Sequence, residues 1–242
     1  MSGEGALMRM LLTAPAVVVA FVTLAAPADA ATRNFGVSGF DRIRVDGPFS
    51  VKLATGVAPF ATATANSSTA LEGVAIAVQG RTLIVKSNRS SWGGYPGQAA
   101  GPVEVSIGTH ELTAAWLNGA GTLTIDKLRG LSFDLSVQGS GAASVAAVEV
   151  DQFKAAVSGT AAISLAGSAL KLTATVNGVS TLQATGLSAK DATFSVNGPA
   201  TVRATVTETA KISAHGPSSV ELSGSPACTV TAAGSANITG CR

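Results

Sequence analysis

The stretch Asn118-Gly119-Ala120-Gly121-Thr122-Leu123-Thr124-Ile125 decides the fold of this chain. Variants of it recur to the C-terminus, led by Gly119, Gly139, Gly159, Gly178, Gly198, Gly216 and Gly234. The steps between these glycines are 20, 20, 19, 20, 18 and 18 residues. A fixed period near this length is the signature of an architecture in which each repeat stacks on the one before.

Equivalent positions of the repeats keep the same class of residue. Counted from the glycine, position −2 holds Leu117, Val137, Val157, Val176, Val196, Ala214 and Ala232. Position +4 holds Leu123, Ala143, Ile163, Leu182, Val202, Val220 and Ile238, and position +2 is always Gly, Ala or Ser. Apolar residues two apart predict two short strands per repeat, each with one side facing a core. The glycine supplies an unusual backbone angle at a corner, and the small +2 residue leaves room there.

Two geometries fit this pattern. Asn-Gly is a strong hairpin signal, so the repeats could form a chain of β-hairpins. In a β-solenoid, each repeat is instead one coil, and equivalent positions stack as parallel ladders. The solenoid is favoured because a change of repeat length would move every later residue off its column, which hairpins do not require.

The sequence divides into three parts. Residues 1–30 form a targeting segment, residues 31–109 form a less regular strand-rich part, and residues 110–242 form the repeat solenoid, with seven coils expected. In the middle part, alternating residues predict strands around 40–45, 49–53, 60–65, 74–78, 83–85 and 103–107. Small and β-branched residues with only 12% charged residues suit packed strands.

The N-terminus has the features of a secretory signal. Arg9 precedes an apolar run from Met10 to about Ala26, and Ala28-Asp29-Ala30 offers small residues for cleavage after Ala30 or nearby. The alternative is a membrane anchor, but the run is short for a spanning helix. We therefore expect an exported protein, periplasmic, associated with the outer membrane or extracellular, with no membrane span after cleavage.

The two cysteines, Cys228 and Cys241, both lie in the last repeat. In an exported protein such a pair is typically a disulfide, although two unrelated thiols are the alternative. A bridge here would hold the final coil.

Residues Ser87 to Pro102 form a loop by composition and contain Trp92 and Tyr95. Aromatic residues in a loop can contact a sugar or a protein partner, so Trp92 and Tyr95 are candidate ligand contacts. The alternative is that Trp92 folds back over apolar surface.

The sequence also resembles a known family. The segment from Phe40 to Leu53 (FDRIRVDGPFSVKL) and the Gly-x-small repeats, such as Gln138-Gly139-Ser140-Gly141, resemble the bacterial putative auto-transporter adhesin, head GIN domain family. The resemblance covers roughly residues 37–240. It implies a right-handed parallel β-helix in an exported protein, and it supplies no catalytic residues.

The favoured function is non-enzymatic adhesion, binding or structural support in the envelope or at the cell surface, through an extended β-helix face. Its partner would be a glycan or an envelope or surface protein, and exposed end coils allow self-association. The alternative is a carbohydrate-active enzyme, a polysaccharide lyase or hydrolase, which would need facing carboxylates. Candidates are Asp126, Asp134, Glu149 and Asp151, but Asp134 shares a column with Lys154, which indicates a surface ion pair.

Other functions have little sequence support. The formal net charge is +2, and the basic residues are scattered, which argues against nucleic-acid binding. His110 and His215 are far apart in the sequence, so neither a metal site nor a cofactor is expected. A Thr ladder for ice or mineral binding is interrupted by Ala142, Ala162 and Arg203.

Overall fold

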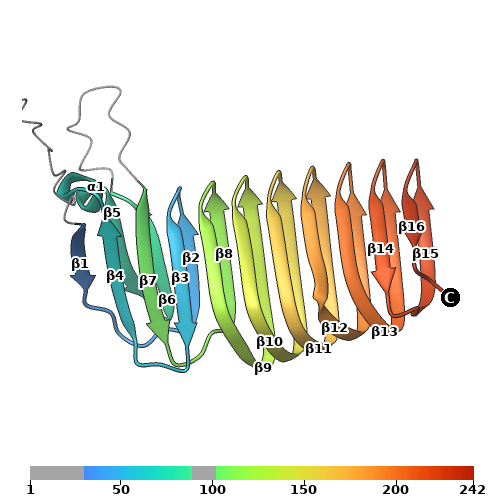
Figure 1. Cartoon of the computed structure of the whole chain (residues 1–242), viewed down its shortest axis with the longest axis horizontal. Helices are drawn as coiled ribbons and strands as arrows, with labels where there is room; N and C mark the ends of the chain where they lie inside the picture. Colours follow the sequence, from blue (N-terminus) through green and yellow to red (C-terminus); the bar gives the residue numbers. More distant parts are fainter. Residues whose placement is uncertain (1–29, 89–101) are drawn as a thin grey trace, which may run out of the picture.

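The computed structural model of the chain is an elongated stack of β-coils (Figure 1). It describes residues 30–88 and 102–242. Five long strands make its centre: β9 (Thr122–Gly139), β10 (Ala142–Gly159), β11 (Ala162–Gly178), β12 (Thr181–Asn197) and β13 (Thr201–His215). Each pairs in parallel with the next, so that Leu123, Ala143 and Ile163 lie side by side, one repeat apart. The predicted right-handed parallel β-helix is confirmed.

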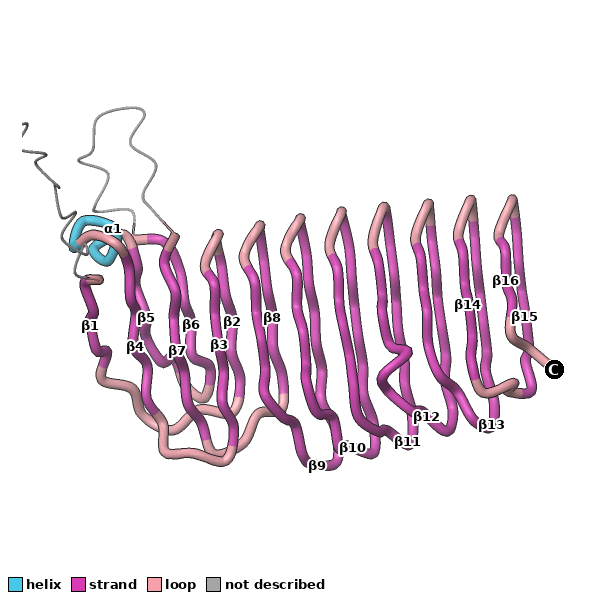
Figure 2. Tube along the Cα trace, in the orientation of Figure 1, coloured by secondary structure: helices cyan, strands magenta, loops and turns pink. Residues whose placement is uncertain are grey.

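Each long strand bends once and contributes to both broad sides of the stack (Figure 2). We call the side formed by the strand segments after each glycine corner face A, as at 122–125, and the side formed by the segments before it face B, as at 133–139. Buried residues alternate along both segments, for example Leu123 and Ile125, then Phe133, Leu135 and Val137. The core is the narrow space between the two faces.

The glycines take the role that the sequence predicts. Gly139 has φ of 109°, and a Cβ on it would lie 2.7 Å from the carbonyl oxygen of Gly119 in the neighbouring coil. At position +2, a Cβ on Gly141 would lie 2.7 Å from the carbonyl oxygen of Gly121. The corners therefore stack so closely that backbone takes the space of a side chain.

The number of coils differs from the prediction. The structure has about six turns of solenoid rather than seven. Seven corner glycines mark the boundaries of six intervals, and each interval is one complete coil. Counting each corner as a coil gives seven, one more than the number of intervals between the corners.

One coil of the same shape lies in the part predicted to be less regular. Strands β2 (Arg42–Asp46) and β3 (Ser50–Thr55) flank Gly47. β3 pairs in parallel with the start of β9, and β2 pairs in parallel with β8 (Ala114–Gly119). A Cβ on Gly119 would lie 3.6 Å from Gly47, so the two corners stack. The repeat pattern hides this coil because residues 56–113 separate it from the next one, and its +2 residue is the large Phe49.

Residues 56–113 add further strands to the stack, first parallel and then antiparallel to their neighbours. β6 (Thr82–Ser87) and β7 (Val103–Thr109) pair in parallel with β2 and β3. β4 (Phe60–Ala65) and β5 (Val74–Gln79) then pair antiparallel with β7 and β6. Helix α1 (Ser68–Glu72) joins them, and β1 (Ala31–Phe35) pairs with β4. All the strands predicted in this part are present.

The opposite end is simpler. β14 (Ser219–Ser223) and β15 (Ala227–Ala233) pair with β13, and β16 (Asn237–Thr239) pairs with β14. Cys228 and Cys241 form a disulfide with a Cα–Cα distance of 5.6 Å, as predicted.

Candidate binding surface

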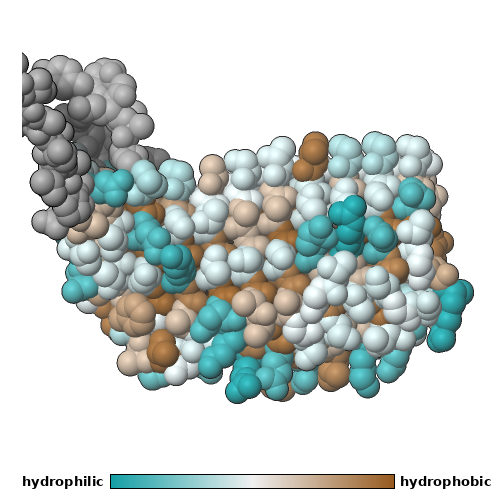
Figure 3. Space-filling model, in the orientation of Figure 1, coloured by the Kyte–Doolittle hydropathy of each residue, from teal (hydrophilic) through white to brown (hydrophobic). Residues whose placement is uncertain are grey.

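Small polar side chains cover much of the two faces. On face A, the Thr122 hydroxyl donates to the Ser50 hydroxyl at 3.1 Å, and the Ser144 hydroxyl donates to that of Thr124 at 3.3 Å. On face B, the Asn197 amide donates to the Asn177 side-chain oxygen at 2.9 Å. Figure 3 shows one broad side, where pale surface of intermediate hydropathy runs across the coils. Such side chains follow from strand alternation, which turns every second residue outward.

Eight charged side chains on these coils form four ion pairs between neighbouring coils. Arg129 contacts Glu149 at 2.8 Å, Arg203 contacts Glu221 at 3.0 Å, Lys190 contacts Glu208 at 3.6 Å and Lys154 contacts Asp134 at 3.6 Å. Stacking brings residues 18 to 20 positions apart side by side, which explains the pairs. All are largely exposed, so each adds little to stability.

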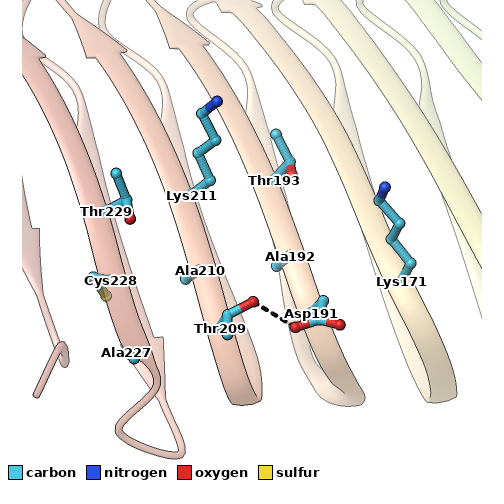
Figure 4. A pocket seen from close by; sticks show the side chains of 10 residues that line it. All are labelled: Lys171, Asp191, Ala192, Thr193, Thr209, Ala210, Lys211, Ala227, Cys228 and Thr229. Carbon is cyan, nitrogen blue, oxygen red and sulfur yellow. Dashed lines mark hydrogen bonds between the residues drawn. The ribbon is translucent and has the colours of Figure 1, made fainter.

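A shallow depression on face B carries two lysines that belong to none of these ion pairs (Figure 4). Its volume is about 470 Å³, and its polar lining includes Lys171, Asp191, Thr209 and Lys211. The Thr209 hydroxyl donates to the Asp191 carboxylate. Neither Lys171 nor Lys211 forms an ion pair with any residue that the structure describes. The two ammonium groups are therefore available to a ligand with acceptor or anionic groups.

The depression borders a change of coil length. The coil from Gly178 to Gly198 spans 20 residues, and the next, to Gly216, spans 18. The register of β12 against β13 shifts between Ala184 and Ser188 and again between Ala189 and Asp191. Beside these bulges the outward residues are mostly small, such as Thr193, Ala227 and Thr229. Sequence reasoning missed this surface, although the shortened step was a usable signal.

Three of the four candidate catalytic carboxylates form structural contacts. Asp134 pairs with Lys154, as predicted, and Glu149 pairs with Arg129. Asp126 accepts hydrogen bonds from the backbone N–H groups of Thr55, at 3.0 Å, and Lys127. The contact with Thr55 joins the early coil to the repeats. Asp151 is exposed on β10.

The remaining candidates have separate outcomes. Trp92 and Tyr95 lie outside the described residues, in the chain between β6 and β7, so their role in ligand contact stays a prediction. The Nε2 atom of His215 lies 3.2 Å from the Ser213 hydroxyl.

Within residues 30–88 and 102–242, no group of three or more His, Cys, Asp or Glu side chains is arranged to hold a metal ion. No helix in the same ranges is long and apolar enough to cross a membrane.

One buried acid belongs to the architecture. Asp41 is 6% exposed, and its carboxylate lies 2.8 Å from the Arg81 guanidinium. The hydrogen bond from Arg81 lowers the pKa of Asp41 despite the opposing effect of burial. The Asp41 carbonyl also accepts a hydrogen bond from the Thr113 N–H at 2.7 Å. Asp41 thus ties the start of β2 to the segments before β6 and β8.

Comparison with known proteins gives one family and several structures. A family model described as "Putative auto-transporter adhesin, head GIN domain" matches residues 39–226. No curated protein matches the chain.

The similar solved structures share the fold at low identity. A putative adhesin from Bacteroides fragilis NCTC 9343 is 18% identical, with a TM-score of 0.79 over 87% of this chain and 96% of that one. A putative lipid binding protein from Parabacteroides distasonis ATCC 8503 is 16% identical, with a TM-score of 0.69 over 88% and 96%. A putative adhesin from Parabacteroides merdae ATCC 43184 is also 16% identical, with a TM-score of 0.66 over 88% and 96%.

Proposed function

Because the chain belongs to the putative auto-transporter adhesin, head GIN domain family, we propose that it is an exported, non-enzymatic binding protein. It acts in the envelope or at the cell surface, and its partner is a glycan held along face B. The disulfide between Cys228 and Cys241 supports export, since such bonds persist in oxidising compartments. The signal predicted in residues 1–30 agrees with this.

One observation carries the proposal: the unpaired lysines of face B beside Asp191. Lys171 and Lys211 flank a carboxylate and several hydroxyls, while Lys154 pairs with Asp134 and Lys190 pairs with Glu208. Sugar hydroxyls can both donate to Asp191 and accept from lysine. Two lysines against one aspartate favour an acidic glycan, and the solenoid offers a long surface for a polymer.

A glycan array with the purified protein tests the proposal. Wild type should bind acidic glycans, and a Lys171→Ala/Lys211→Ala double variant should lose at least about tenfold in affinity, since each lost charged contact costs roughly 1 kcal/mol or more. Lys86→Ala/Lys127→Ala removes the same charge from exposed sites elsewhere and should bind like wild type.

A pull-down from envelope extract runs beside the array. Equal glycan binding by both double variants would show that the glycan contacts the protein outside the depression. Silence in both assays would overturn glycan binding, and capture of a protein alone would replace the glycan with a protein partner. Fractionation of cells carrying the tagged protein separates periplasmic from surface roles.

A further inference from the structure

The C-terminal end of the stack leaves core positions open. Val230 is 45% exposed, although its column partner Ile212 is 1% exposed. Ala232 is exposed and Ile238 is half-buried, in columns that are buried in the earlier coils. These core-facing apolar side chains are therefore left uncovered at the end of the stack, where no further coil of the described chain packs on them.

The same end carries a free strand edge. β15 pairs with β13 and β16 pairs with β14, and among the described residues neither has a partner on its outer side. An unpaired edge is a template for another strand unless charges, proline or bulges protect it. Residues 222–241 contain no Asp, Glu, Lys or Arg, and neither β15 nor β16 contains proline.

We propose that this end is a self-association surface, at which two copies of the chain join end to end through antiparallel pairing of their last coils. Like charges that face each other across a contact between identical surfaces repel, and β15 and β16 carry none; Arg242 lies beyond these strands, beside Pro226. The N-terminal end differs: α1 lies against β1, β4 and β5, and β1 carries Arg33. The contact is therefore tail to tail and closes at two copies.

The small area of the end face indicates a weak contact. Seven residues of β15 span about 23 Å, and two packed sheets with their side chains are about 20 Å thick. The end face is then roughly 460 Å² per copy, or about 900 Å² in total. Stable complexes bury about 1,200 Å² or more, so the dimer is weak and forms at micromolar concentration.

The disulfide holds the two edge strands, β15 and β16, in a fixed arrangement. Cys241 follows β16, and Cys228 lies within β15, so the bond ties the two edge strands to each other. The backbone N–H of Arg242 also donates to the Pro226 carbonyl at 3.2 Å. An ordered edge loses less entropy on pairing than a frayed one.

Sedimentation of the purified protein from about 1 to 300 µM tests the inference, a range that brackets micromolar association. The mass should rise from one copy to two and stop there. Val230→Lys, which puts a charge on the edge, should weaken association by at least about tenfold. Leu131→Lys, at a 78% exposed leucine on the bend of β9, should associate like wild type.

Hydrogen exchange of the wild-type protein tests the same contact without a substitution, in case Val230→Lys disturbs the last coil. In wild type, β15 amides should become more protected as concentration rises, and those of β4 should not. Monomer at every concentration would overturn the proposal, even if another protein binds this end. Growth beyond two copies would overturn tail-to-tail closure. Lys171→Ala/Lys211→Ala, which changes neither edge strand, should associate like wild type, which separates this inference from the proposed function.

Discussion

The two ends of the solenoid close the same core by different means. At the N-terminal end the chain reverses, so that β4 and β5 run antiparallel to the coil beside them, and α1 buries Ala70 and Leu71. At the C-terminal end the last coil simply follows the others, with a disulfide and an exposed Val230. One end is thus covered by added chain, and the other is held by a covalent bond.

This difference shows that a regular repeat does not determine its own termini. Each internal coil is covered on both sides by neighbours, but an end coil has one neighbour only, which is why repeat proteins need distinct terminal units. The stability of the covered end should therefore depend on side-chain packing, and the stability of the open end on the disulfide.

The largest effect is expected from removing the disulfide. In the chain-entropy model, a loop closed by cysteines 13 positions apart stabilises by about 3 kcal/mol. Cys228→Ser/Cys241→Ser should therefore increase hydrogen exchange in β15 and β16 while leaving β2 and β6 unchanged. Uniform destabilisation of the whole chain would contradict the local role of the bond.

The next effect contrasts one residue type at the two ends. Val74, in the end strand β5, is 2% exposed, and Val230 is 45% exposed. Val74→Ala should cost about 2–3 kcal/mol, because two buried methyl groups are lost and a cavity remains. Val230→Ala should cost less than about 1 kcal/mol.

Chemical denaturation of both valine variants, with the exchange of end amides as local readout, makes the comparison. Equal costs would mean that the C-terminal end is covered in solution. For this reason the measurement is made at low protein concentration, where the proposed dimer is dissociated.

The regular part of the fold could be predicted because stacking repeats one physical constraint. Gly139 must leave room for the backbone of Gly119, so glycine recurs at each corner, and Val137 and Val157 share a buried column. The early coil around Gly47 obeys the same geometry but occurs once before a long excursion, so no period marks it. The reversal at β4 leaves no trace in hydrophobic alternation, which has the same period in either strand direction.

The candidate surface was less predictable. Asp134 and Lys154 share a column, so their pairing follows from the period alone. The depression near Lys171 and Lys211 depends on bulges in β12, whose position among similar small residues the sequence does not specify.

A smaller effect is expected at the helix of the covered end. The Ser67 hydroxyl accepts a hydrogen bond from the Ala70 N–H at 3.2 Å and caps α1. Ser67→Ala should cost about 1 kcal/mol, as is typical for a lost N-cap. Thermal unfolding measures the loss, and Ser67→Asp, which restores an acceptor, should recover most of it. No recovery with Asp would mean that the cap does not hold the helix.

The smallest effect concerns acid stability at the covered end. The Arg81 guanidinium lowers the pKa of Asp41 below its ordinary value of 3.8, so ionised Asp41 favours the folded state. Its contribution is complete above pH 3.8 and is lost as pH falls through the lowered pKa. Wild type should therefore lose more stability than Asp41→Asn as the pH falls below 4. Denaturation at pH 2.5, 4 and 7 measures the difference, and parallel pH profiles would show that Arg81 does not favour the charged carboxylate. Residues of the C-terminal coil, which lie far from Asp41 along the stack, should keep the same pH response in both proteins.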